Sequence, residues 1–368
     1  MNPAIDTLTS EERTLLKLRA LYRQYGYAQF RMSKFEEYDL YAGNKDFLVS
    51  ENVLTFTDLN GKLMALKPDV TLSIVRASPD RTDSVRKVFY NENVYRTAGS
   101  TRAFREIPQT GLECIGPIDD YCILEVLLLA AESLRRISDR CVLEISHLDI
   151  LAALTEGLGV TEEVRRKLLK CIGAKNLHEL RELCREAGAD PEKAETLGKL
   201  AAAGGKPEEV LDILRSLPCP PEAVRQLEAI AQGFRASGLE DMLRMDFSVV
   251  NDMQYYNGIV FRGFVFGVPV SVLSGGQYDR LMRKMGRSAG AIGFAVYLDE
   301  LERIVPEDDS PDADVLLLYD EEVSPARICR EARALAAEGK TVMAQRQAPE
   351  GARFGEVRRL SGEEGRDA

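Results

Sequence analysis

The sequence has few of the residues from which metal sites are built. Its 368 residues include only two histidines, His147 and His178, and none of its seven cysteines is spaced as C-x-x-C. Structural zinc sites need clustered cysteine and histidine ligands. We therefore expect no metal and no other cofactor, with reduced thiols that pack as small hydrophobic side chains in a cytoplasmic protein.

Long hydrophobic runs are also missing. No stretch of 18 apolar residues occurs, and the N-terminus has no basic segment followed by an apolar core. A membrane-spanning helix needs about 20 mostly apolar residues, and a signal peptide needs that N-terminal pattern. We therefore expect neither a membrane partner nor secretion.

Basic residues are outnumbered by acidic residues. Lys and Arg number 48 against 59 Asp and Glu, which gives a net charge of −11. Nucleic-acid-binding proteins usually gather positive charge to neutralise phosphates. Arg96, Arg102 and Arg105 lie in a predicted polar loop, where solvated charge is favoured over contact with nucleic acid. The balance argues against tRNA as a partner.

The composition is that of a globular protein, with 45% hydrophobic and 29% charged residues. The length suits two or three domains. We predict a core over residues 1–305 with a helical insertion at about 147–240. An acidic, proline-bounded linker follows at 306–311. The segment 312–368 is predicted to be a short strand–helix–strand unit with a frayed polar tail from 345 onward.

The core pattern predicts strands joined mostly by short turns and helices that are grouped. Thr9 and Glu12 form a capping-box pattern before a helix over 10–25, and Asn60-Gly61 predicts a hairpin over 52–66. Further strands are predicted at 85–92, 111–116, 141–145, 243–249, 258–266 and 268–273, and further helices at 119–137, 277–285 and 294–304. This arrangement favours an α+β fold with an antiparallel sheet over a doubly wound one.

Five stretches of the sequence, taken in order, resemble the motifs of class II aminoacyl-tRNA synthetases of the histidyl type. They are residues 66–71, 89–92 with 109–116, 254–261, 274–281 and 291–301. The resemblance covers about residues 10–145 and 240–305. It implies a class II synthetase-like antiparallel sheet flanked by helices, and a C-terminal remnant of an anticodon-binding domain.

The departures from that family lie at its phosphate-binding arginines. By the resemblance, the α-phosphate arginine is replaced by Tyr90, the γ-phosphate arginine on the closing helix by Glu300, and the arginine of the histidyl-specific element by Asn251. Activation of an amino acid develops negative charge that fixed cations stabilise, and the loss of one such donor costs about 3–4 kcal/mol. We expect no catalysis by this chain, although Arg303, one helical turn on, is an alternative cation.

The amino-acid side of the family's pocket is better preserved. The resemblance places six residues in contact with histidine: Asp69, Thr71, Gln109, Glu113, Tyr256 and Tyr278. Carboxylates suit an ammonium or imidazole N–H, and hydroxyls fix orientation. Two interpretations remain open, namely a retained histidine pocket and hydrogen bonds that merely hold the core.

This profile resembles the regulatory subunits of ATP phosphoribosyltransferase, a non-catalytic branch related to histidyl-tRNA synthetase (the HisZ family). The resemblance implies a hetero-oligomer in histidine biosynthesis, in which this chain activates a short catalytic subunit, self-associates as a dimer or larger, and takes part in histidine feedback. Two alternatives stay open: a histidyl-tRNA synthetase-like enzyme, and an amino-acid-binding module with another partner.

Overall fold

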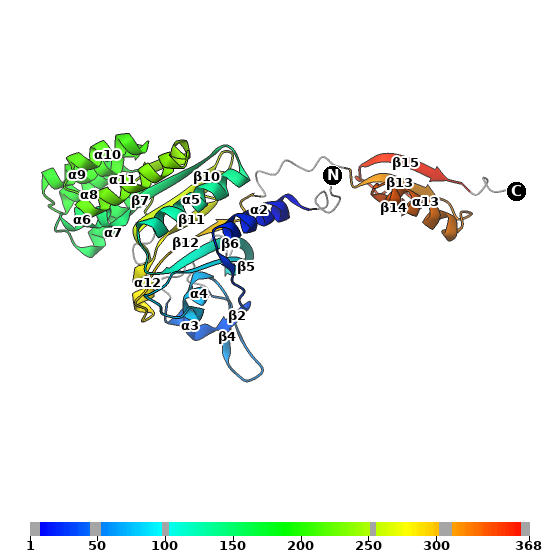
Figure 1. Cartoon of the computed structure of the whole chain (residues 1–368), viewed down its shortest axis with the longest axis horizontal. Coiled ribbons are helices and arrows are strands. Elements are labelled where there is room, and N and C mark those ends of the chain that lie inside the picture. The colour runs from blue at the N-terminus through cyan, green and yellow to red at the C-terminus, as the bar shows by residue number, and fades with distance from the viewer. Residues whose placement is uncertain (1–7, 45–52, 98–102, 251–254, 302–310, 362–368) are drawn as a thin grey trace. The chain divides into compact units, whose positions relative to one another are not determined.

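The chain forms two compact units, Met1–Ile304 and Val305–Ala368 (Figure 1). The structure is a computed structural model, and it describes residues 8–44, 53–97, 103–250, 255–301 and 311–361. None of the helices in these ranges is long and apolar enough to cross a membrane.

A nine-stranded sheet forms the centre of the first unit, in the order β1-β5-β6-β12-β11-β10-β7-β9-β8. Neighbours are antiparallel except for β1 with β5 and β7 with β9. The predicted antiparallel α+β sheet is therefore confirmed. The strands are β1 (Ala28–Gln29), β5 (Arg86–Thr97), β6 (Phe104–Gly116), β7 (Cys141–His147), β8 (Gly204–Gly205), β9 (Leu243–Asp246), β10 (Asn257–Val265), β11 (Leu273–Gln277) and β12 (Gly290–Tyr297).

Two long helices cover one face of this sheet (Figure 1). Helix α2 (Ser10–Gln24) begins at the predicted capping box of Thr9 and Glu12, and α5 (Asp120–Ile137) begins at Asp119, whose side chain accepts from the Cys122 N–H. The helices are joined by a buried hydrogen bond of 3.1 Å between Tyr22 Oη and Ser133 Oγ. Their apolar sides close the main hydrophobic core over the sheet.

The opposite face carries short elements and a second apolar cluster. A small sheet in the order β2-β4-β3 contains the predicted hairpin, in which the Asp58 carboxylate accepts from the N–H groups of Asn60 and Lys62, and Gly61 has φ +80°. The elements are β2 (Phe35–Glu37), α3 (Tyr38–Ala42), β3 (Thr55–Thr57), β4 (Leu63–Leu66), α4 (Thr71–Ala77) and α12 (Asp279–Lys284).

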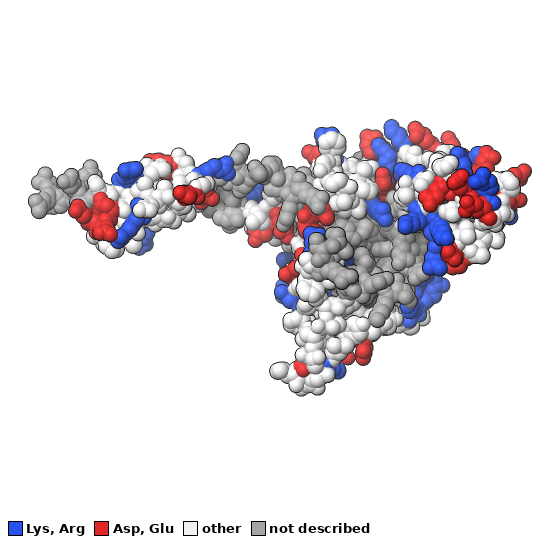
Figure 2. Space-filling model, turned by 180° about the vertical axis from the view of Figure 1, so that it is seen from behind, with Lys and Arg blue, Asp and Glu red and all other residues white. Residues whose placement is uncertain are grey.

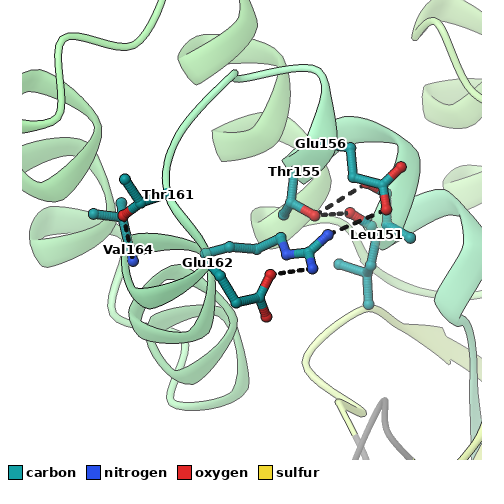
Figure 3. A network of polar contacts seen from close by, with 8 residues as sticks. Leu151, Thr155, Glu156, Thr161, Glu162 and Val164 are labelled. Carbon is teal, nitrogen blue, oxygen red and sulfur yellow. Dashed lines mark hydrogen bonds and ion pairs between the residues drawn. The ribbon is translucent and has the colours of Figure 1, made fainter.

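Helices occupy the chain between β7 and β9, as the apolar spacing predicts. They are α6 (Leu148–Glu156), α7 (Glu162–Gly173), α8 (Leu177–Glu186), α9 (Pro191–Ala202), α10 (Pro207–Ser216) and α11 (Pro221–Ala236). At the junction of α6 and α7, Arg165 bridges Glu156 and Glu162, and Thr161 caps α7 through the Val164 N–H (Figure 3). The insertion adds its own apolar side chains to the main core.

The helix predicted at residues 294–304 is wrong for residues 294–300, because the segment up to Tyr297 belongs to the central strand β12 and a turn follows it, while residues 302–304 lie outside the described residues. Both faces of β12 are covered, so its run of apolar residues has no clear alternation and reads as a buried helix. The strand predicted at 268–273 is also misplaced. Residues 266–272 form turns and bends, and β11 begins at Leu273.

The polar loop predicted around Arg96 and Arg105 is wrong as well. Strands β5 and β6 extend beyond their apolar parts, and Arg96 and Arg105 are direct cross-strand partners. Polar pairs such as Tyr95 Oη donating to Glu106 at 2.9 Å stabilise this ribbon, although its composition resembles a loop. Arg102 lies outside the described residues.

The second unit is a three-stranded parallel sheet in the order β14-β13-β15 with one helix. It comprises β13 (Ala313–Tyr319), α13 (Pro325–Ala337), β14 (Val342–Gln345) and β15 (Phe354–Leu360). The prediction of a frayed tail from residue 345 is corrected by β15, which pairs with β13 over Ala313 to Tyr319. Pairing with an apolar central strand stabilises β15 despite its polar sequence.

Candidate ligand-binding site

A cavity of about 500 Å³ opens on the face of the central sheet that α2 and α5 leave uncovered. All six residues predicted to contact histidine line it, and so does Tyr90. Asn251 lies outside the described residues, and Glu300 is not among the lining residues. The full lining is Asp69, Val70, Thr71, Tyr90, Arg96, Gln109, Glu113, Val250, Tyr255, Tyr256, Arg262, Ser271, Ser274, Tyr278, Gly293, Phe294, Ala295 and Tyr297.

The floor of the cavity is made of small side chains on the middle strands. Gly293 on β12 pairs with Glu113 on β6, and a Cβ at Gly293 would stand 1.8 Å from Glu113 Oε2. A Cβ at Gly111 would stand 2.1 Å from the Phe294 carbonyl oxygen. Neither distance is possible for a real side chain, so glycine is required at both positions to keep the site open.

Glu113 is the central acidic group of the cavity and is only 2% exposed. Thr71 Oγ1 donates to its Oε1 at 2.8 Å, and Tyr278 Oη donates to its Oε2 at 2.5 Å. Burial raises the pKa of Glu113 to about 8, against the opposing effect of these two hydrogen bonds. A ligand with an N–H or a positive charge would favour the ionised carboxylate here.

Asp69 supplies a second carboxyl group just before α4. Its Oδ1 accepts from the Leu72 N–H at 2.8 Å, which fixes the side chain at the start of the helix. Burial raises the pKa of Asp69, while the Leu72 hydrogen bond and the charge of Arg96 lower it. Two acidic groups in one enclosed site favour a cationic ligand over an anionic one at this end.

Aromatic and amide groups complete the acidic end. The rings of Tyr255 and Tyr256 are 4.4 Å apart, and those of Tyr255 and Tyr278 are 5.9 Å apart, so three tyrosines border the carboxyl groups. Gln109 is 4% exposed, and its Nε2 has no hydrogen-bond partner within the described residues. A buried donor left unsatisfied costs about 1–3 kcal/mol, so this amide is suited to an acceptor on a bound ligand.

Tyr90 presents a neutral ring where the family resemblance places an arginine. It lies on β5, is 2% exposed, and its hydroxyl lies over Gly111, where a Cβ would come within 2.6 Å of it. Burial, reinforced by the charge of Glu113, raises the pKa of Tyr90, so the phenol is uncharged at neutral pH. At this position the cavity therefore presents a neutral phenol in place of the cation that the family resemblance implies.

Glu300 follows β12 in a turn rather than on a closing helix. The preceding residue, Asp299, forms an ion pair of 3.4 Å with Arg105. The predicted alternative cation, Arg303, lies outside the described residues. The acidic character of this turn is therefore established, whereas the placement of Arg303 stays a prediction.

Two cations that line the cavity, Arg96 and Arg262, were not predicted to do so from the sequence. Arg96 Nε donates to the Pro68 carbonyl at 3.0 Å, and the Tyr297 and Ser274 hydroxyls are 2.6 Å apart. The alternation within β10 places Arg262 on the same face as Ser274. That signal needs the pairing of β10 with β11, which the sequence alone does not provide.

The Histidyl-tRNA synthetase family model matches residues 6–301. The chain belongs to the histidyl-tRNA synthetase family. Within this family, an ATP phosphoribosyltransferase regulatory subunit from Bacillus cereus is 28% identical to it over 314 residues, which cover 82% of this chain and 74% of that protein.

Solved structures of the family support the fold. A Bacillus halodurans structure described as an ATP phosphoribosyltransferase regulatory subunit/histidyl-tRNA synthetase has a TM-score of 0.74 at 22% identity, covering 96% of this chain and 94% of that chain. A chain of the ATP phosphoribosyl transferase (HisG:HisZ) complex from Thermotoga maritima has a TM-score of 0.63 at 20% identity, covering 79% of this chain and 98% of that chain. At these identities the likeness concerns the fold, which is that of the histidyl-type class II core.

Proposed function

We propose that this chain is the regulatory subunit of ATP phosphoribosyltransferase in histidine biosynthesis. It activates a short catalytic subunit, which carries the chemistry, and takes part in histidine feedback. The observation that carries the proposal is the neutral, buried Tyr90 at the position where the family resemblance implies a phosphate-binding arginine. The similarity to a Bacillus cereus protein named as such a subunit supports it.

The first consequence is that this chain alone does not form histidyl-adenylate. Without a cation at Tyr90, the negative charge that develops at the α-phosphate is not stabilised, and one lost donor lowers the rate by about 10²–10³. The measurement is histidine-dependent exchange of pyrophosphate into ATP, with an active histidyl-tRNA synthetase as the positive control. Exchange above background by the purified chain would refute the non-catalytic assignment.

The second consequence is activation of a partner enzyme. The chain, mixed with a short-form ATP phosphoribosyltransferase, is expected to form a stable hetero-oligomer and to raise the rate of phosphoribosyl-ATP formation. The measurement is co-elution in size-exclusion chromatography together with the rate with and without this chain. Separate elution and an unchanged rate would favour an amino-acid-binding module with another partner.

Histidine is the proposed ligand of the cavity. The Glu113 and Asp69 carboxyl groups suit its imidazole N–H or ammonium, and the unsatisfied Gln109 amide suits one of its acceptors. Calorimetry should show heat with the wild-type chain and none with Glu113→Ala. The control is Glu106→Ala, because Glu106 lies on the same strand, is exposed and does not line the cavity. If the wild-type chain and Glu113→Ala gave the same heat, or neither gave any, histidine would not be the ligand of this cavity.

The second unit and the net charge bear on whether the protein binds tRNA and on where it is located. Val305–Ala368 is proposed to be related to an anticodon-binding domain, and its described residues contain a helix and a small sheet. The net charge of −11 supports a protein that does not bind tRNA, and we place this protein in the cytoplasm with the rest of the proposed pathway. A filter-binding titration with tRNA tests the point, and saturable binding at physiological salt would contradict it.

A further inference from the structure

The acidic end of the cavity can bind the ammonium and imidazole groups of histidine but not its carboxylate. Glu113 and Asp69 can hold positive or N–H groups, but a free amino acid also carries a carboxylate, which needs a donor of positive charge in an enclosed site. The family resemblance would place that donor at Asn251, which is uncharged. The cavity therefore needs another cation if its ligand is an amino acid.

Arg262 lies at the other end of the cavity floor. Cross-strand pairing runs from Tyr90 to Gly111, Ala295, Ser274 and then Arg262, over β5, β6, β12, β11 and β10. The three residues between Tyr90 and Arg262 are small, and the Tyr297 side chain reaches this row through its hydroxyl, which is 2.6 Å from Ser274 Oγ. Both Arg262 and Ser274 line the cavity.

The strand register sets the spacing between the two ends of the cavity. Glu113 on β6 and Arg262 on β10 are three strands apart in the sheet and two residues apart in register, which corresponds to about 14 Å across the strands and about 7 Å along them. Both side chains line the same cavity and so shorten that span. A ligand that contacts both side chains must therefore extend along the cavity floor between them.

Arg96 is less suited to this role, although it also lines the cavity. Its Nε is engaged by the Pro68 carbonyl at 3.0 Å, and its charge lies close enough to Asp69 to lower the pKa of that carboxyl group. Arg262 also has an acidic neighbour, Glu144, its partner on β7. Glu144 does not line the cavity, and a guanidinium with five N–H donors can serve a carboxylate on either side.

We propose that Arg262 binds the carboxylate of the ligand and makes the cavity select an amino acid over its amine or alcohol analogue. This inference rests on the proposed histidine pocket. The carboxylate lies at the Arg262 and Ser274 end, and the imidazole lies among Glu113, Tyr278 and Tyr256. A planar guanidinium that forms two parallel hydrogen bonds gives this end its geometric preference for a carboxylate.

The test compares histidine with histidinol and histamine, which keep the imidazole and the amine but lack the carboxylate. Calorimetry on the full chain should show tighter binding of histidine than of either analogue by about 10- to 100-fold. Arg262→Gln should reduce that preference to less than about threefold while leaving the weak binding of histamine unchanged. Arg262→Lys should retain part of the preference, because it keeps the charge but not the paired hydrogen bonds.

A matched control is Arg105→Gln, which removes one positive charge from the neighbouring ribbon outside the cavity and should leave the preference intact. Each variant is judged by the ratio of its affinities for histidine and for the analogues. A change in overall stability would alter both affinities alike and therefore would not produce the same result. A wild-type chain that binds no histidine would overturn the pocket and this inference together. Histidine binding with an unchanged preference in Arg262→Gln would overturn the role of Arg262 alone.

Discussion

The two faces of the central sheet are built from neighbouring residues of the same strands, and they differ in almost every property. On β5, Phe89 belongs to the main core under α2 and α5, whereas Tyr90 lines the cavity. On β6, Leu112 belongs to that core, whereas Glu113 lines the cavity. The helix-covered face is continuous and apolar, while the other face carries charges, hydroxyls and glycines around a space.

The difference shows how one sheet combines stability with binding. Tight apolar packing on one face holds the strands in register, and this register brings Glu113, Gly293 and Arg262 into one site. The cavity face can then contain glycines and a buried carboxyl group, both of which are unfavourable for stability by themselves. Substitutions on the two faces should therefore have different effects.

The largest effect is expected on the core face. Phe89→Ala should lower the free energy of unfolding by about 3–5 kcal/mol, because it removes a fully buried ring that packs 6.0 Å from the Tyr22 ring. The comparison is Tyr90→Ala on the same strand. Tyr90 borders an existing cavity, so this substitution should lower the free energy of unfolding clearly less than Phe89→Ala does. Urea denaturation measures both values, and equal losses would mean that the two faces contribute alike to stability.

A smaller loss is expected from closing the floor of the cavity. Gly293→Ala should cost about 3 kcal/mol and abolish ligand binding, because its Cβ would overlap Glu113 Oε2 and the Leu112 carbonyl. Gly198→Ala in α9 is the control, since a Cβ there meets nothing within 4 Å and alanine favours the helix. Thermal denaturation should show a lower melting temperature for Gly293→Ala but not for Gly198→Ala. An unchanged melting temperature in Gly293→Ala would show that the floor of the cavity can shift to accommodate the added Cβ.

The smallest change expected in a single comparison is the one per pH unit that Glu113 confers on stability. Its pKa is raised from 4.5 to about 8, so between these values the folded chain holds a proton that the unfolded chain has released. This contribution is complete below about pH 4.5 and is lost as the pH rises through 8, with a slope of at most about 1.4 kcal/mol per pH unit. Glu113→Gln should flatten the curve between pH 5 and 8.

The matched control for the pH experiment is Glu106→Gln on the same strand. Hydrogen bonds from Asn93 and Tyr95 lower the pKa of Glu106, so its contribution changes only in the acid range. Denaturant titrations at each pH measure the slopes. If Glu113→Gln and wild type had parallel curves between pH 5 and 8, the buried carboxyl group would not have the raised pKa that its surroundings imply.

Much of the fold could be predicted because local signals agree with tertiary structure in many elements. The capping box at Thr9, the Asn60-Gly61 turn and the apolar spacing of the insertion each specify their element locally. The prediction was wrong for β12 and β15, whose strand pairing overrides their local patterns. A fully buried strand and a polar strand both lack the alternation on which sequence reasoning depends.

The candidate site shows a similar division. The residues at its acidic end, among them Glu113 and Tyr278, were found through the family resemblance, and the structure brings them within hydrogen-bond distance. Arg262 carried no such signal. It became a candidate only when the order of strands placed β10 on the floor that β6 and β12 share.

The sequence by itself determined the acidic balance, the family motifs and the substitution of Tyr90 for a cation, because these depend only on which residue stands at which position. Tertiary structure decided the size of the cavity, the raised pKa of Glu113 and the position of Arg262 across from it. Burial and distance across a sheet arise from contacts between strands that are far apart in the chain. The chemistry of a side chain is local, but its environment is set by the fold.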